Sequence, residues 1–493
     1  LEQPLKCLRT HSINIRGNYF QQFRVKVGRK KAVMQSQSKS KFYSLAEISA
    51  SFKKGEIKPS EVLEYYLKQI EEKDPHTQAF ESKYLDSALA SGKSADLAMT
   101  SGNLIGPFHG VPFVLKDICE LKGHVTTGGS KVFRDRVSKT TATVAKRLLA
   151  AGGVLLGKSK TVEFAFGGWG TNQKMGTPKN PWDSTDHRVC GGSSAGSAAA
   201  IAADMAICGI GTDTGGSVRL PAAFCGLTGL KVTKGLLSTD GILPLSHTLD
   251  TPGPMARSLL DMVIMLEVLI GTEGWKIDKK IKGEKGYFKN LIGNVSGLRI
   301  GIINERDRQE CDFEVLDHYD KALRILEEQG AILDTYNPPV EYSTISTKVG
   351  NIIAVEAYYH HGQLYEDMEK PMDEDVRERV LKVRNFSAND YLSLLEERKD
   401  AERLFSRSMT KFDAIVTPTI VNVAPLLCDV DQAVSPGYFT RPFNYAGMCA
   451  LSLPIGLSKN GLPLSFQIAG RPNNEGMTLQ VGAAIERGIS SIF

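Results

Sequence analysis

Two glycine-rich stretches of the sequence carry serines in a setting that could support nucleophilic catalysis. "CGGSSAGSAAA" spans residues 190–200 and "GTDTGGSVRLP" spans residues 211–221. Successive small residues let consecutive backbone N–H groups converge on one point, which makes a nest for an anion. Such a nest can hold the oxyanion of a tetrahedral intermediate, with Ser217 at its edge as the attacking group. A tight helix–strand junction would select the same small residues, so these residues alone leave both interpretations open.

An attacking serine needs a base, and no histidine stands in a context that singles it out. Lys116, in "GVPFVLKD", ends an apolar run that predicts a buried strand. Burial disfavours the ammonium form and therefore lowers the pKa of a lysine, and a neutral lysine can act as a base. Lys116 is thus the best candidate for the base, although an ordinary surface lysine at a strand end is the competing interpretation.

A literal phosphate-loop match runs from Gly152 to Ser159, but its setting is wrong. The motif requires a strand before the loop and a helix after it. Here an amphipathic helix is predicted over residues 141–151, and "VLLGKSK" at residues 154–160 is itself the predicted strand. We therefore expect no nucleotide site at this position.

The elements that must position these residues alternate between helix and strand, which predicts an α/β protein. Apolar residues at helical spacing predict helices over residues 44–55 and 59–75, the second ended by Pro75. Apolar runs at residues 297–304 and 412–420 predict buried strands, and the charged stretch 366–407 predicts solvated helices.

Charge divides the chain into two parts. Residues 1–40 hold nine lysines and arginines against Glu2 alone, whereas the rest is mildly acidic. We expect residues 1–40 to be a poorly ordered basic tail, either a leader or a remnant of expression, and residues 41–493 to form one domain. An organellar transit segment is the alternative for the tail, with the cytoplasm expected otherwise. The acidic body shows no basic face for nucleic acid, and no apolar run of about 18 residues predicts a membrane span.

Cysteine and histidine usage favours neither disulfides nor a metal site. The eight cysteines include no C-x-x-C pair, and a chain of this length does not need disulfides for stability. His360 and His361 are adjacent, and neighbours on one element point apart. We interpret the cysteines as reduced and expect no metal.

Several of these blocks resemble the amidase signature family of serine hydrolases. "GGSSAGSAAA" and "GTDTGGSVRLPAAFCGLTGLKVTKG" are similar to its signature, "HGVPFVLKD" to the segment with its lysine, and "HTLDTPGPMARS" to its downstream block. "NPWD" and "GLPLSFQIAGRPNNEG" also look like family segments. The resemblance covers roughly residues 44–484, with the blocks in the family's order.

The resemblance implies one large α/β domain, a mixed twisted sheet covered by helices on both faces, with no metal and no organic cofactor. It also implies a Ser–Ser–Lys triad. Ser217 would attack the amide carbonyl, and Ser193, preceded by a cis peptide bond, would pass the proton to neutral Lys116. Asp213 and Arg219 would brace the loop, and Ser194 and Ser197 would form hydrogen bonds within it. The expected oxyanion and substrate-binding positions are Thr214, Gly215, Gly216 and Ala165, with the Ser217 N–H as a further oxyanion donor.

The family contains more than one activity. We expect a stand-alone amidase that hydrolyses a linear carboxylic amide through an acyl-enzyme, with esters and carbamates as further candidate substrates. The alternatives are the A subunit of a tRNA-dependent glutamine amidotransferase, which would have a protein partner, and a catalytically inactive binding protein. The amidotransferase subfamily has an acidic residue where Gly437 stands, and an arginine that residues 354–367 lack. Both departures favour the stand-alone amidase.

The substrate pocket is expected from residues 164–170, 358–361 and 438–445, which are aromatic and nearly uncharged. This composition favours a neutral aryl or alkyl amide. Arg441 is expected to face solvent or a structural acid, with a substrate carboxylate as the alternative. The expected partner is therefore a small-molecule amide, and the chain is expected to be a monomer or homodimer.

Overall fold

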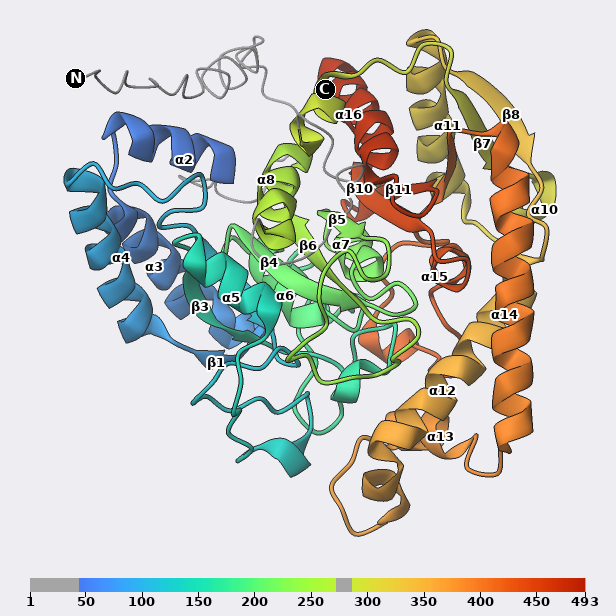
Figure 1. Cartoon of the computed structure of the whole chain (residues 1–493), viewed down its shortest axis with the longest axis horizontal. Helices are drawn as coiled ribbons and strands as arrows, with labels where there is room; N and C mark the ends of the chain where they lie inside the picture. The colour runs from blue at the N-terminus through green and yellow to red at the C-terminus, as the bar shows by residue number, and fades with distance from the viewer. Residues whose placement is uncertain (1–43, 272–285, 493) are drawn as a thin grey trace, which may run out of the picture. The chain divides into compact units, whose positions relative to one another are not determined.

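An eleven-stranded sheet forms the centre of the computed structural model, which describes residues 44–271 and 286–492 (Figure 1). In spatial order the strands are β1 (Phe80–Lys83), β3 (Val154–Ser159), β2 (Pro112–Lys116), β4 (Cys208–Asp213), β6 (Thr251–Ala256), β5 (Thr228–Lys231), β10 (Cys449–Leu457), β11 (Pro463–Gly470), β9 (Ala414–Pro418), β7 (Arg299–Ile303) and β8 (Ile332–Tyr336). The described residues fall within one compact unit.

The sheet is mixed. Strand β2 lies parallel to β3 and β4, and β7 lies parallel to β8 and β9. The other neighbouring strands are antiparallel. The predicted α/β fold with a mixed sheet is confirmed.

Every residue of β2, β3 and β4 is buried. Successive side chains of a strand point to opposite faces, so complete burial requires that both faces of this part of the sheet are covered. Helix α6 (Ala195–Ala202) packs on all three strands, and α8 (Leu259–Ile270) packs on β4, β5 and β6.

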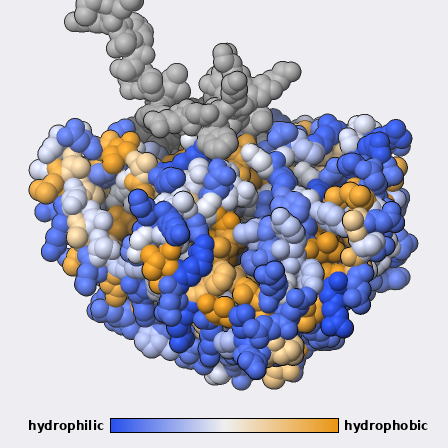
Figure 2. Space-filling view, turned by 60° about the horizontal axis from the view of Figure 1, so that its bottom comes forward, coloured by the Kyte–Doolittle hydropathy of each residue, from blue (hydrophilic) through white to orange (hydrophobic). Residues whose placement is uncertain are grey.

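The surface facing the viewer in Figure 2 is mostly hydrophilic, with hydrophobic side chains gathered near its middle.

Twelve further α-helices lie in the described residues. They are α2 (Leu45–Lys54), α3 (Pro59–Thr77), α4 (Leu85–Thr100), α5 (Thr143–Ala150), α7 (Arg219–Phe224), α10 (Glu305–Arg308), α11 (Phe313–Glu328), α12 (Tyr342–Glu366), α13 (Glu374–Leu381), α14 (Ala388–Ser408), α15 (Arg441–Tyr445) and α16 (Glu475–Ile492). None of the helices in the described ranges is long and apolar enough to cross a membrane.

Helix α3 corrects one predicted boundary. It continues through Pro75 to Thr77 instead of ending at the proline. Pro75 lies in the last turn, where its missing N–H removes a single hydrogen bond. The Gln78 N–H then closes the helix by donating to the Asp74 carbonyl at 2.7 Å.

The prediction that the phosphate-loop match is a strand is confirmed. Val154–Ser159 form β3, and the Lys158 ammonium is wholly buried. It lies 2.9 Å from Asp117 Oδ1 and 2.9 Å from Thr126 Oγ1, so this lysine is engaged inside the core. The predictions for the basic tail, residues 1–40, lie outside the described residues.

Candidate active site

Lys116 is the last residue of β2 and is wholly buried. Because β2 and β4 are parallel neighbours, their carboxyl ends lie at the same edge of the sheet. Lys116 Nζ donates to Ser193 Oγ at 2.7 Å and to Thr212 Oγ1, near the end of β4, at 2.8 Å. Burial lowers the pKa of Lys116 to about 7. A substantial share of this amine is therefore neutral near pH 7 and can accept a proton.

Ser193 lies in the loop that leads into α6, and the Gly192–Ser193 peptide bond is cis, as the resemblance implied. The loop is held closely against its surroundings. Gly191 has φ of 74°, and a Cβ added there would lie 2.5 Å from Phe224 Cδ2, so this position requires glycine. The Ser193 carbonyl accepts a hydrogen bond from Thr161 Oγ1 at 3.0 Å.

The two following serines fix the same loop against β4. The Thr212 N–H donates to Ser194 Oγ at 3.3 Å, and Ser197 Oγ donates to the Ile210 carbonyl at 3.1 Å. These contacts match the loop hydrogen bonds expected of Ser194 and Ser197. They tie the loop with Ser193 to the strand that ends beside Lys116.

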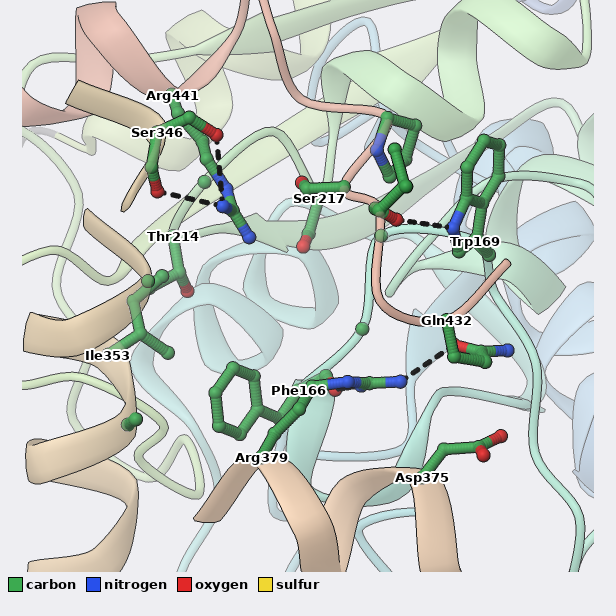
Figure 3. Close-up of a pocket in the computed structure, with 18 of the residues that line it drawn as sticks. Phe166, Trp169, Thr214, Ser217, Ser346, Ile353, Asp375, Arg379, Gln432 and Arg441 are labelled. Atoms are coloured by element: carbon green, nitrogen blue, oxygen red, sulfur yellow. Dashed lines mark hydrogen bonds between the residues drawn. The ribbon is translucent and has the colours of Figure 1, made fainter. Parts of the chain in front are cut away.

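Ser217 lies between β4 and α7, and its side chain points into the cavity (Figure 3). Its carbonyl accepts from the Ser194 N–H at 3.4 Å, which ties it to the loop of Ser193. Its hydroxyl makes no hydrogen bond to any other group in the described part of the chain. Hydrogen bonds between catalytic groups are often long before substrate binds and tighten in the complex. The structure thus gathers all three residues of the expected triad at one edge of the sheet.

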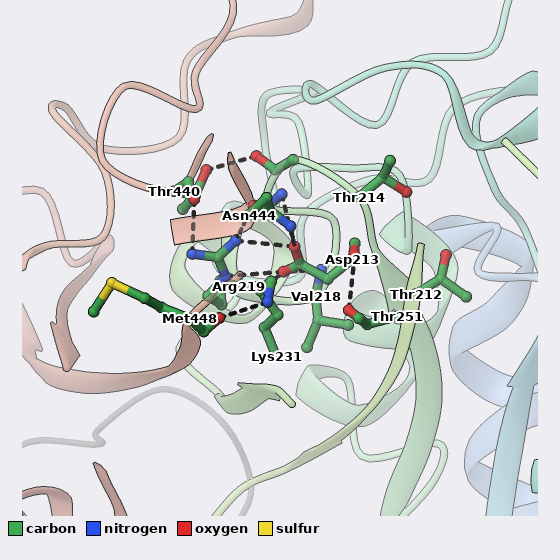
Figure 4. Close-up of polar contacts among 12 residues, drawn as sticks. Thr212, Asp213, Thr214, Val218, Arg219, Lys231, Thr251, Thr440, Asn444 and Met448 are labelled. Carbon is green, nitrogen blue, oxygen red and sulfur yellow. Dashed lines mark hydrogen bonds and ion pairs between the residues drawn. The ribbon is translucent and has the colours of Figure 1, made fainter. Parts of the chain in front are cut away.

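The Asp213 carboxylate is the centre of a buried network beneath this loop (Figure 4). Its Oδ1 accepts from Arg219 Nη2 at 2.9 Å, from Asn444 Nδ2 at 2.8 Å and from the Gly216 N–H at 2.9 Å. Its Oδ2 accepts from Arg219 Nε at 2.9 Å. Burial alone would raise the pKa of Asp213, but the Arg219 guanidinium holds it well below its usual range. The charged pair fixes the backbone on both sides of Ser217.

Two of the expected oxyanion and substrate-binding positions, Gly216 and Ala165, have N–H groups that already donate to acceptors within the protein. The Gly216 N–H is engaged by Asp213, and the Ala165 N–H donates to the Val162 carbonyl at 2.8 Å. Neither is available as an oxyanion donor, although Ala165 lines the cavity. The N–H groups of Thr214, Gly215 and Ser217 remain as candidates. Gly216 matters for a different reason: its φ is 133°, and an added Cβ would lie 2.3 Å from Thr440 Oγ1.

A cavity of about 680 Å³ opens in front of Ser217. Its wall differs from the predicted one. Residues 165–169 line it, but residues 358–361 do not, and from 438–445 only Arg441 does. His361 instead stacks on the Phe164 ring, with centroids 4.0 Å apart, behind the lining. The other lining segments are residues 214–220, 346–354 of α12, 375–382 at and after α13, and 432–436, together with Leu245.

The cavity is also more charged than predicted. Asp375, Glu378, Arg379 and Lys382 line it together with Arg441, which corrects the expectation of a nearly uncharged pocket. The charged stretch 366–407 predicts solvated helices, but one side of α13 lines the cavity (Figure 3). Arg379 Nη2 donates to Gln432 Oε1 at 2.7 Å, which joins two walls of the cavity.

Thr212 was not singled out by the sequence, although it is the second acceptor of the Lys116 ammonium. In the sequence, Thr212 is marked only by its position directly before Asp213, near the end of an apolar run. In the structure this run forms β4, which lies parallel to β2, the strand that ends at Lys116. Within the described ranges, no group of three or more His, Cys, Asp or Glu side chains is arranged to hold a metal ion.

Comparisons with known proteins identify the family of this chain and agree with its fold. A family model described as Amidase matches residues 61–479. The A subunit of glutamyl-tRNA(Gln) amidotransferase from Alkaliphilus metalliredigens (strain QYMF) is 31% identical over 474 residues, which cover 90% of this chain and 96% of the relative. A chain from a structure described as "An unexpected vestigial protein complex reveals the evolutionary origins of an s-triazine catabolic enzyme" is 26% identical, with a TM-score of 0.83 over 90% of this chain and 98% of that chain. Another, "Crystal structure of amidase", is 25% identical, with a TM-score of 0.80 over 90% and 99%. This chain belongs to the amidase family.

Proposed function

We propose that this chain is an enzyme that cleaves the C–N bond of a carboxylic amide through an acyl-enzyme on Ser217. The observation that carries the proposal is the hydrogen bond of 2.7 Å between Lys116 Nζ and Ser193 Oγ, both wholly buried. The pKa of Lys116, lowered by burial to about 7, supports its role as the base. Membership of the amidase family supports the reaction class.

The proposed reaction begins with attack of Ser217 Oγ on the amide carbonyl carbon. The Ser217 proton passes to Ser193 Oγ, and the Ser193 proton passes to neutral Lys116. Collapse of the tetrahedral intermediate breaks the C–N bond, and the leaving nitrogen takes a proton back from Lys116 through Ser193. Water, activated by the same relay, then attacks the ester carbonyl and releases the carboxylic acid and free Ser217.

The N–H groups of Thr214, Gly215 and Ser217 are the proposed donors to the oxyanion. A preorganised donor of this kind stabilises the transition state by about 2.7–4 kcal/mol. In this proposal Asp213 and Arg219 act indirectly, because their buried pair fixes the backbone that carries these N–H groups.

Two activities share this chemistry, and different observations favour each. The name of the relative from Alkaliphilus metalliredigens favours the glutamine amidotransferase subunit, in which glutamine would supply ammonia, more strongly than the stand-alone amidase. Gly437, and the absence of an arginine in residues 354–367, favour a stand-alone amidase. The hydrogen-bonded Lys116–Ser193 pair argues against an inactive binding protein.

The purified chain, incubated with a panel of primary amides that includes free glutamine, tests the proposal through released ammonia. A serine-reactive fluorophosphonate provides an independent readout. We expect ammonia release, and labelling at Ser217 that is absent from Ser217→Ala. Turnover by the chain alone supports the stand-alone amidase, whereas turnover of glutamine only with partner subunits supports the amidotransferase. If the probe labels nothing and no amide is cleaved under either condition, the proposed function is wrong.

A further inference from the structure

Arg441 brings a positive charge to the cavity beside Ser217. It is the first residue of α15 and lines the same cavity as Ser217 and Gly215. Its side chain passes closely between Gly215 and Gly437. A Cβ added to Gly215 would lie 3.4 Å from Arg441 Cγ, and a Cβ added to Gly437 would lie 3.1 Å from the same atom. In Figure 3 the free end of its guanidinium and the Ser217 hydroxyl point into the same space.

This guanidinium has no carboxylate partner. Its Nη1 donates to the Ser346 carbonyl at 2.8 Å and to Ser346 Oγ at 3.1 Å, and both acceptors are uncharged. No Asp or Glu oxygen of the described residues lies within 4.0 Å of it. Arg219 provides the contrast, because Asp213 binds its guanidinium through two oxygens. Arg219, which is wholly buried, has a built-in counter-ion, whereas the half-buried Arg441 has none.

The missing counter-ion has an energetic consequence. A charge removed from water is costly unless an opposite charge compensates it. Burial, followed by repulsion from Arg379, lowers the pKa of Arg441 to about 10, which still leaves the group charged at neutral pH. Asp375 lies across the cavity, on the same side as Arg379 (Figure 3). Glu378 also lines the cavity, and neither carboxylate forms an ion pair with Arg441. Arg441 therefore presents a cation without a paired carboxylate to a ligand bound beside Ser217.

Gly437 contributes to the absence of a carboxylate beside Arg441. A Cβ at position 437 would lie 3.1 Å from Arg441 Cγ, so any other residue there would place its side chain against this arginine. An acid there would stand beside the guanidinium as an internal counter-ion. Glycine supplies no side chain at this position and therefore no carboxylate to pair with Arg441.

We propose that Arg441 binds a carboxylate of the substrate, so that the amide attacked by Ser217 belongs to a molecule that also carries a carboxylate. The class includes monoamides of dicarboxylic acids and ω-amides of amino acids. This inference rests on the proposed function, and it replaces the expected neutral aryl or alkyl amide. A guanidinium can donate two parallel hydrogen bonds to a carboxylate, which sets the orientation of the substrate as well as its affinity.

A matched pair of substrates tests the proposal. Glutaramate carries a carboxylate, and 5-oxohexanamide replaces that group with an uncharged acetyl of similar shape; succinamate and adipamate, each with its acetyl counterpart, extend the series. We expect the parent to prefer at least one carboxylate by about 10- to 100-fold in kcat/KM, the range expected for hydrogen bonds to a charged group. Arg441→Met should lose this preference, mainly through KM, while it still cleaves the neutral amide. Arg441→Lys should keep part of the preference, and Lys382→Met, which removes another positive charge from the cavity, should keep it in full.

Equal rates for the charged and neutral members of every pair would overturn the inference, as would an Arg441→Met enzyme with the parent's preference. Calorimetric titration of Ser217→Ala with glutaramate separates this outcome from a failure of the proposed function, because binding needs no turnover. Binding that disappears when Arg441→Met is added supports the carboxylate site even if no amide is cleaved. Absence of binding in Ser217→Ala, or binding that survives Arg441→Met, overturns it.

Discussion

Lys116 Nζ and Ser193 Oγ lie 2.7 Å apart at the carboxyl end of β2, and both side chains are wholly buried. A contact of this length can carry a proton in either direction. When Lys116 is neutral, the serine hydroxyl can donate to it, and when Lys116 is protonated, the ammonium donates to the serine. The same contact thus suits removal of a proton from a nucleophile and its later return to a leaving group. The first predictions follow from this pair and from Ser217 beside it.

Ser217→Ala should abolish amide cleavage without disturbing the fold. Loss of a nucleophile costs up to about 10⁶-fold in kcat in a well-studied serine hydrolase, so we expect a loss of at least about 10⁴-fold. The hydroxyl makes no hydrogen bond to another described group, so thermal unfolding should change little. Ser91→Ala, on the exposed side of α4, is the matched control and should behave like the parent. Retention of a tenth of the activity by Ser217→Ala would exclude it as the nucleophile.

The pH dependence of activity should report the ionisation of Lys116. Only the neutral amine can take the proton, so kcat/KM should be low in acid, rise with a midpoint near the lowered pKa of about 7, and then level off. Lys116→Met should be nearly inactive, and Lys116→Arg should fail as well because a guanidinium stays charged at any usable pH. The check is a profile from about pH 5 to 9. The same rise at a comparable rate in Lys116→Met would mean that another group is the base.

The same pKa shift predicts how stability changes with pH. Lys116 has a pKa of about 7 when folded against an ordinary value of 10.5, so between these values the unfolded chain binds more protons. Burial of this group therefore destabilises the folded state fully below pH 7, and the destabilisation disappears as the pH rises towards 10. Lys116→Met should unfold at a higher temperature than the parent at pH 7, with a gap that narrows towards pH 10. A gap that stays constant or widens over this range would contradict the lowered pKa.

The sequence predicted those parts of the site that short local patterns encode. Lys116 ends an apolar strand, and the serines stand in glycine-rich stretches that resemble a known family, so their meeting could be expected. The residues that line the cavity could not be predicted, because helical spacing does not show which neighbouring element a face of α13 contacts. Arg441 is the clearest case: no local pattern distinguishes an arginine paired with an acid from one left without a carboxylate. Such facts depend on segments far apart in the chain.

Asp213→Asn should destabilise the protein strongly. The substitution leaves the Arg219 guanidinium buried without its opposite charge, and breaking a buried pair in this way costs about 3–5 kcal/mol. Urea unfolding measures the change. Asp317→Asn is the control, because it breaks an ion pair of similar length, to Lys321, on the exposed face of α11 and should change stability little. Equal effects of the two substitutions would contradict the bracing role of Asp213.

Thr212→Val tests whether the second acceptor of Lys116 positions this amine and sets its pKa. The substitution keeps the shape of the side chain and removes the oxygen that lies 2.8 Å from Nζ. A hydrogen bond to the charged form favours that form, so its loss should lower the pKa of Lys116 further, by about one unit, and shift the rise of activity to lower pH. Thr212→Ser, which restores the hydroxyl, should return the midpoint to that of the parent.

Thr251→Val is the control for a buried threonine. The Thr251 hydroxyl donates to the Asp213 carbonyl at 2.8 Å and does not contact Lys116, so its loss should reduce stability without moving the midpoint. A midpoint that stays in place or moves to higher pH in Thr212→Val would show that this contact does not control the proton on Lys116.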